Sequence, residues 1–136
     1  MSPEDCSSLR RVPGERFDFL HGEIVNQLWF WGMIRLVFDQ PSEGPWYVDV
    51  EQARLVDPSG SASLINAAGP PLGTAPMLQL LKQGVTDASS EDGVLTVRFT
   101  NGLTLEALPH SEHESWTVAG PRGVTQCLAG GELTSW

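Results

Sequence analysis

A repeated seven-residue pattern is the feature of this sequence that most restricts its fold. The stretches 32–38 and 93–99 both begin with glycine, end with phenylalanine and are mostly apolar in between. After each stretch, Glu, Pro and Gly recur at the same spacing: Glu51, Pro58 and Gly60 in the first case, and Glu114, Pro121 and Gly123 in the second. Two matches in the same order predict an internal duplication of a strand-rich unit.

The length of 136 residues suits one domain with a core of its own. We expect a flexible N-terminal tail at 1–16, which mixes Ser, Pro, Gly and charges without apolar periodicity. We expect a single β-rich domain at 17–136, with duplicated halves at about 22–66 and 84–136. The organisation is therefore a tail followed by two related halves.

The duplication can be aligned in two ways. One alignment matches Glu51 with Glu114. The other matches 48–51 with 103–106, which makes 109 to about 116 an insertion in the second half. Both alignments remain open, and both predict two antiparallel β-meanders related by a pseudo-repeat.

Strands in the first half are expected at 23–31, 33–39 and 46–56, because β-branched and aromatic residues dominate these runs. The last run alternates in polarity, so that its acids share one face. The two faces hold Tyr47, Asp49 and Glu51 on one side, and Trp46, Val48 and Val50 on the other.

The hairpin after residue 93 allows its register to be predicted. A two-residue turn at Asn101-Gly102 would mix apolar and polar side chains on both faces. A three-residue loop at 100–102, with Gly102 in the left-handed conformation, gives one apolar face. The pairs on that face are Phe99 with Leu103, Val97 with Leu105, and Leu95 with Ala107.

One short helix is expected at about 75–83, between the two meanders. Thr74 is suited to cap its first turn, Pro76 is tolerated there, and Gly84 supplies a left-handed end. The fold class is therefore α+β and mostly antiparallel β, with two meanders and one helix between them.

Net charge is −9, and the part from Phe17 onward holds fourteen acids and five bases. Nucleic-acid binding needs clustered cations, whereas these bases are scattered singly, so we expect no nucleic acid as a partner. No apolar run approaches the roughly 20 residues of a membrane span, and the N-terminus lacks a secretory pattern. We expect a cytoplasmic protein without a membrane partner. Its acidity either serves solubility or steers a basic protein toward it.

Residues that carry chemistry in other proteins form no convincing constellation here. Cys6 and Cys127 are expected to stay reduced, and no serine lies in a nucleophile motif. The run 110–114 holds two histidines and two glutamates, but it lacks the helical spacing of a zinc motif and follows Pro109. We expect a solvated connection there, with no metal site, no cofactor and no catalytic residue.

The aromatic run Leu28-Trp29-Phe30-Trp31 is the strongest candidate for a binding surface. A strand here places Trp29 and Trp31 on one face, and a small sheet has difficulty covering both of its faces. Aromatic residues are enriched at interface cores, so this face is covered either by another chain or by the helix and the tail of this one. The expected partner-binding residues are Trp29, Trp31, Trp46, Tyr47, Asp49 and Glu51.

Several segments resemble a family of small uncharacterised bacterial proteins, largely actinobacterial, of unknown function. The segments are 92–93 with 99–102, Glu114-Ser-Trp116, Gly120-Pro-Arg-Gly123 and the terminal Gly-Gly-x-Leu-x-x-Trp at 130–136. The likeness covers most of 20–136 and implies a compact β-rich domain without an assigned activity. In size, charge and strand content the chain is also similar to the small acidic immunity proteins that neutralise secreted toxins.

Two functions follow as hypotheses. The first is a non-enzymatic protein-binding module, acidic and immunity-like, whose partner is a basic protein or a second copy of the chain. The second is a small-molecule binder or enzyme with a cleft between the two meanders. That site would use Asp49, Glu51 and the loop from His110 to Glu114.

Overall fold

The computed structural model describes residues 14–38, 46–121 and 123–136. Three short 3-10 helices accompany the strands: η1 (Asp18–Leu20), η2 (Pro71–Leu80) and η3 (Ala129–Gly131). The strands are β1 (Glu15–Arg16), β2 (Val25–Phe30), β3 (Ile34–Phe38), β4 (Trp46–Val50), β5 (Gln52–Val56), β6 (Ala62–Asn66), β7 (Val85–Glu91), β8 (Val94–Phe99), β9 (Thr104–Ala107), β10 (Trp116–Gly120), β11 (Gly123–Cys127) and β12 (Leu133–Ser135). The structure is therefore mostly antiparallel β, as predicted.

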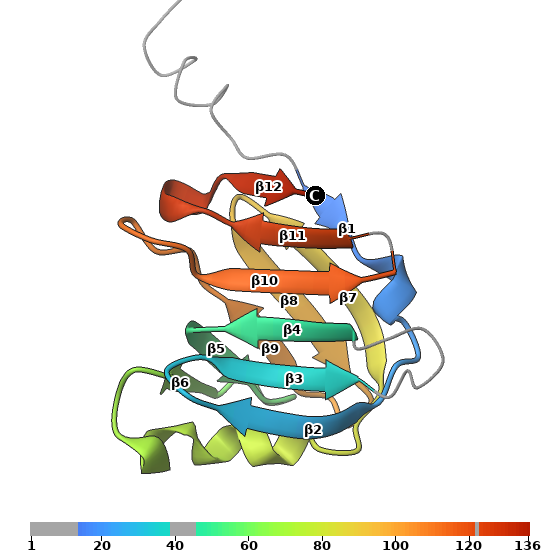
Figure 1. Ribbon diagram of the computed structural model, residues 1–136. Coiled ribbons are helices and arrows are strands. Elements are labelled where there is room, and N and C mark those ends of the chain that lie inside the picture. Colours follow the sequence, from blue (N-terminus) through green and yellow to red (C-terminus); the bar gives the residue numbers. More distant parts are fainter. Residues whose placement is uncertain (1–13, 39–45, 122) are drawn as a thin grey trace, which may run out of the picture.

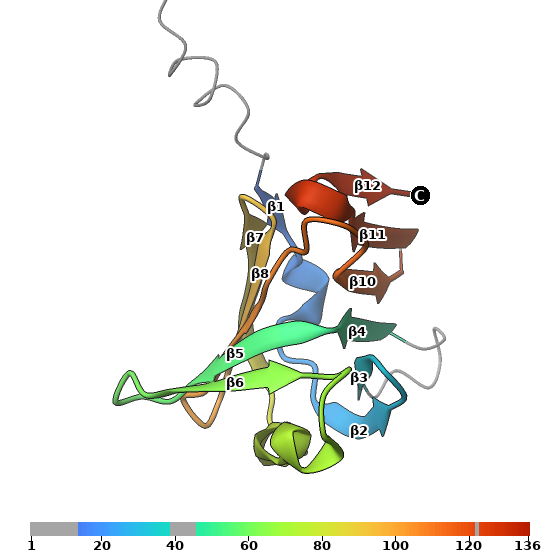
Figure 2. The ribbon, with the colours of Figure 1, turned by 90° about the vertical axis from the view of Figure 1, so that its left-hand side faces the viewer.

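Two six-stranded antiparallel sheets form the two layers of the domain (Figures 1 and 2). The first sheet has the order β2-β3-β4-β10-β11-β12, and the second has the order β6-β5-β9-β8-β7-β1. The helix η2 lies at the end of the molecule where β2 and β6 form the sheet edges (Figure 1). Among the described residues, no helix is long and apolar enough to cross a membrane.

Five of the six strands in each sheet follow a common order, in which a meander of three strands adjoins a hairpin of two. In the first sheet the meander β2-β3-β4 is followed by β10-β11, and in the second the meander β7-β8-β9 is followed by β5-β6. Each half therefore gives three strands to one sheet and a hairpin to the other. From β2 onward the chain changes sheets twice, between β4 and β5 and between β9 and β10.

These two crossings lie side by side, because β4 pairs with β10 and β5 pairs with β9. Glu51 alone separates β4 from β5, whereas residues 108–115 separate β9 from β10. The Glu51 N–H donates to the Ser115 carbonyl at 3.1 Å, and the Leu108 N–H donates to the Gln52 carbonyl at 2.9 Å. The topology matches the alignment in which the second half carries an insertion.

The single strand predicted at 46–56 is therefore two strands in different sheets. Its first part follows the predicted alternation, since Trp46, Val48 and Val50 are all buried. Asp49 and Glu51 do not share a sheet face, because the chain leaves the first sheet at Glu51. The crossing depends on pairing with distant strands, which the local pattern does not reveal.

The core fills the space between the inner faces of the two sheets. Strand β3 has the expected alternation, with Ile34, Leu36 and Phe38 facing inward. The largest buried ring is Trp116, whose indole Nε1–H donates to the Gly93 carbonyl at 2.8 Å. This bond ties β10 to the turn between β7 and β8.

The predicted hairpin register is confirmed. Val97 pairs with Leu105 and Leu95 with Ala107, while the Phe99 N–H donates to the Leu103 carbonyl at 3.0 Å. Gly102 has φ +87°, the left-handed conformation that closes a three-residue loop. The hydrophobic pattern was sufficient to predict the register of β8 and β9, because a one-residue slip would turn every apolar side chain outward.

The helix lies between the meanders in sequence, but it spans 71–80 and is a 3-10 helix. Pro71 occupies its first turn, where a missing N–H costs nothing, and Pro76 inside it removes a further donor. Thr74 is inside the helix rather than at its cap, and its hydroxyl donates to the Pro71 carbonyl at 2.6 Å. The left-handed residue after the helix is Lys82, at φ +68°, rather than Gly84.

The N-terminal tail was predicted for 1–16. Residues 1–13 lie outside the described residues, whereas Glu15 and Arg16 form β1 and pair with Ser90 and Ser89 of β7. An edge strand of this kind protects β7 from pairing with another chain.

Candidate functional site

The outer face of the first sheet carries an aromatic cluster centred on Arg35. In the register of this sheet, Arg35 lies opposite Trp29 on β2 and opposite Asp49 on β4. The guanidinium carbon of Arg35 is 3.8 Å from the Tyr47 ring centroid, 5.1 Å from that of Trp31 and 5.7 Å from that of Trp29. We call Trp29, Trp31, Arg35 and Tyr47 the aromatic face.

A bidentate ion pair fixes the centre of the aromatic face. Arg35 Nε donates to Asp49 Oδ1 at 2.7 Å, and a terminal guanidinium nitrogen donates to Asp49 Oδ2 at 2.9 Å. Only 25% of the Arg35 side chain and 11% of the Asp49 side chain are exposed. The hydrogen bonds to Asp49 raise the pKa of Arg35 although burial acts in the opposite direction. The planar cation therefore stays charged and holds the surrounding rings against it.

The two tryptophans of the aromatic face remain open to solvent, with Trp29 48% and Trp31 53% exposed. The Trp29 indole N–H donates to Gln27 Oε1 at 2.7 Å, so its orientation is fixed in the free protein. Rings held in this way lose little conformational freedom when a partner covers them. The bond to Gln27 and the contacts with Arg35 thus favour one arrangement of these rings before binding.

Two of the expected partner-binding residues lie elsewhere. Trp46 is 7% exposed and packs edge-on against Phe19, with ring centroids 5.5 Å apart, because its position in β4 faces the core. Glu51 lies at the crossing between the sheets and faces His113. Asp49 is on the outer face, but both of its carboxylate oxygens are bonded to Arg35.

Exposed apolar side chains continue from the aromatic face toward η2. Phe30 and Trp31, at the end of β2, line a surface hollow together with Leu72 and Leu78 of η2. Leu72 is 88% exposed, Leu78 is 53% exposed and Phe30 is 46% exposed. Large apolar residues gathered in this way on a surface are typical of interaction sites.

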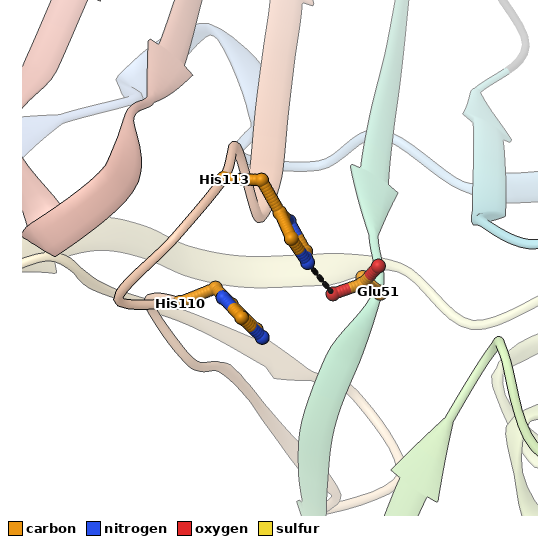
Figure 3. Close-up of side chains that lie close together, drawn as sticks. All are labelled: Glu51, His110 and His113. Carbon is orange, nitrogen blue, oxygen red and sulfur yellow. Dashed lines mark ion pairs between the residues drawn. The ribbon is translucent and has the colours of Figure 1, made fainter.

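A second cluster forms at the crossing of the two halves, where the loop 108–115 lies beside Glu51 (Figure 3). His113 Nε2 is 3.6 Å from Glu51 Oε1, and the rings of His110 and His113 stack with centroids 3.7 Å apart. One ligand atom from each residue lies within 4.8 Å of the other two. We call Glu51, His110 and His113 the crossing cluster.

The backbone fixes which nitrogen of His113 carries a proton. His113 Nδ1 is 2.8 Å from the Glu114 carbonyl oxygen, which can only accept, so Nδ1 is the donor. In the neutral ring, Nε2 then presents a lone pair toward Glu51. His110 differs, because its Nδ1 accepts the Glu112 N–H at 3.0 Å.

The sequence analysis favoured a solvated connection for this loop, and it grouped the two histidines with Glu51 only in the alternative small-molecule site, which also included Asp49. The structure brings the two histidines together with Glu51, which is about 60 residues away in the chain. Glu112 and Glu114, the other acids of that run, are not in the cluster. Arg35 was also missed as a site residue. The available signal was the alternation of side chains along β2 and β3, which allows Arg35 to share a sheet face with the two tryptophans.

Cys127 is a free thiol and is fully buried. Burial raises the pKa of its thiol, which disfavours the reactive thiolate. It therefore belongs to the core rather than to a site.

The chain belongs to a family of unknown function, DUF6188, whose family model matches residues 18–136. The family resemblance inferred from the sequence is thereby confirmed at the level of a family without an assigned activity. No curated protein and no solved structure matches the chain significantly. Any function must accordingly be argued from the chain's own surface and clusters.

Proposed function

We propose that this member of DUF6188 is a non-enzymatic protein-binding module, and that the aromatic face is the centre of its contact surface. The observation that carries the proposal is the set of half-exposed rings around the Arg35–Asp49 ion pair. Tryptophan, tyrosine and arginine are the residues that most often dominate binding energy at protein interfaces. The adjoining apolar residues of η2 supply the additional contact area.

The partner we propose is a basic protein. The chain carries a net charge of −9, so a basic partner is attracted over long range, whereas a second copy of the chain is repelled. The aromatic face itself is close to neutral because Arg35 and Asp49 compensate each other. Charge therefore accelerates the encounter, and the rings supply the contact, as expected of an immunity-like protein that neutralises a basic toxin.

The alternative of a small-molecule binder or enzyme using Asp49, Glu51 and the loop 110–114 has less support. Asp49 is engaged by Arg35 on the outer face, while Glu51 faces His113 at the crossing. The acids therefore serve different partners and cannot act as a pair on one substrate. A surface hollow with a mostly apolar lining lies beside η2, and its lining does not include these groups.

The test is a double variant, Trp29→Ala with Trp31→Ala, compared with the wild type and with Trp136→Ala. Trp136 is 66% exposed at the end of the chain beyond β12, at the opposite edge of the same sheet, and is thus a matched control. Tagged protein is used to capture partners from the source cells at low and at high salt, and light scattering on a size-exclusion column gives the oligomeric state. Circular dichroism checks that each variant is folded.

We expect a monomer that captures a basic protein at low salt, with capture lost in the double variant and retained by Trp136→Ala. Capture that both tryptophan variants retain would refute the aromatic face as the contact surface. A wild-type dimer that the double variant converts to a folded monomer would replace the basic partner with a second copy of the chain. A double variant that unfolds would show that these rings act in stability instead.

A further inference from the structure

We propose that the crossing cluster of Glu51, His110 and His113 is a zinc-binding site. Two imidazoles and one carboxylate are a ligand set typical of zinc sites that keep one coordination position open. Calcium and magnesium prefer oxygen ligands only, so the two histidines select a transition metal. The cluster lies outside the aromatic face and is independent of the proposed protein binding.

The contact between His113 and Glu51 is the first argument. Because His113 Nδ1 donates to the Glu114 carbonyl, the neutral ring directs its Nε2 lone pair at a carboxylate oxygen 3.6 Å away. Two acceptors that face each other are unfavourable unless a proton or a cation lies between them. The separation exceeds that of a hydrogen bond, and it is close to the ~3.4 Å between two ligands that bind one tetrahedral zinc ion with bonds of about 2.1 Å.

The backbone arrangement around His113 is the second argument. Histidines that bind zinc commonly donate their other ring N–H to a carbonyl or carboxylate, which fixes the tautomer and the ring orientation. The Glu114 carbonyl already holds His113 in this way, at 2.8 Å. Glu51 is positioned from the other side, because its own N–H is bonded to the Ser115 carbonyl within the same loop.

His110 completes the set after a local adjustment. Its ring stacks on His113 with an angle of 16° between the planes, which keeps the two imidazoles side by side. Binding through Nε2 requires a tilt of this ring and a proton on Nδ1, which replaces the hydrogen bond from the Glu112 N–H. The three ligand atoms, now within 4.8 Å of one another, must approach by up to about 1.4 Å to reach zinc geometry. His110 lies on a loop between strands, where such a movement costs little.

The consequence of binding is a cross-link between the two halves of the chain. Glu51 belongs to the crossing from β4 to β5, and both histidines belong to the crossing from β9 to β10. Zinc would therefore join segments about 60 residues apart in the chain and stabilise the folded state. The His113 side chain is 43% exposed, which gives the ion a path from solvent and leaves a fourth position for water.

The test is titration of chelator-treated protein with Zn²⁺ by calorimetry, and with Co²⁺ by visible absorption as a spectroscopic probe of tetrahedral geometry. The variants are Glu51→Gln, His110→Ala and His113→Ala, and the control is His21→Ala, which removes the third histidine of the chain, in the turn after η1. Thermal unfolding with chelator shows that each variant folds without metal.

We expect one Zn²⁺ per chain with a dissociation constant in the micromolar range, weakened about tenfold or more by each cluster variant and unchanged in His21→Ala. Zinc should also raise the melting temperature of the wild type and not that of His113→Ala. The absence of saturable binding below about 100 μM would overturn the proposal, as would binding that survives His110→Ala and His113→Ala together.

Discussion

Replacing Gly93 with alanine tests the close approach that joins the central hairpin to the C-terminal segment. Gly93 has φ +79°, and a Cβ atom there would lie 2.8 Å from the Gly131 Cα and 3.0 Å from the Gly131 carbonyl oxygen. Both neighbours are backbone atoms, so they cannot move aside as a flexible side chain would. The substitution combines left-handed strain of about 1–2 kcal/mol with overpacking of about 1–3 kcal/mol. We expect the free energy of unfolding to fall by about 2–5 kcal/mol.

Gly60→Ala is the matched control, because Gly60 has φ +93° and nothing lies within 4 Å of a Cβ atom there. This variant carries only the backbone strain, so a loss of about 1–2 kcal/mol is expected. Urea unfolding followed by tryptophan fluorescence measures both variants, and their difference isolates the contact with Gly131. If the two variants lose the same stability within about 0.5 kcal/mol, the close approach does not contribute and the reasoning fails.

Three further predictions concern single buried or exposed groups. Trp116→Phe leaves the buried Gly93 carbonyl without its indole donor, so a loss of about 2–4 kcal/mol in urea unfolding is expected, and a loss below 1 kcal/mol would contradict this. In a Cys6→Ser background, Cys127 should react with a thiol reagent only as fast as the protein unfolds, because burial raises the pKa of its thiol; rapid labelling of the folded protein would refute this. The hydrogen bond from Ser59 lowers the pKa of Asp57 below 3.8, with smaller contributions from backbone N–H groups, so the stability that the carboxylate contributes is present above pH 3.8 and lost as the pH falls through its folded pKa. The stability difference between wild type and Asp57→Ala should therefore shrink in acid, and a difference that is constant from pH 6 to pH 3 would contradict the assignment.

The parts of the fold that could be predicted are those governed by neighbouring residues. Alternation of apolar and polar residues was enough for the inward face of β3 and for the register of β8 and β9, because a shifted register would expose the same side chains. The same alternation placed Trp29 and Trp31 on one face, and both rings do lie near Arg35. These relations extend over only a few residues of the chain.

Other features depended on contacts between distant segments and could not be predicted in this way. The run from Trp46 to Val56 reads as one strand, and only its pairing with β10 and then with β9 divides it at Glu51. The helix was expected to begin near residue 75, whereas its 3-10 form and its start at Pro71 follow from two prolines that limit the backbone donors. Trp46 was assigned to the surface because it is aromatic. The alternation of side chains along β4 already placed it on the same face as the buried Val48 and Val50.

The two crossings differ in length, and only the longer one carries the histidines of the crossing cluster. With this strand order the chain passes between the sheets at two adjacent points, after β4 and after β9. The first crossing uses Glu51 alone, but the second is lengthened to 108–115 and carries both histidines. The extra length is not needed to join β9 to β10, since the other half makes the equivalent connection with one residue. The proposed zinc site therefore depends on the longer of the two connections, which backbone hydrogen bonds hold beside the carboxylate of the shorter one.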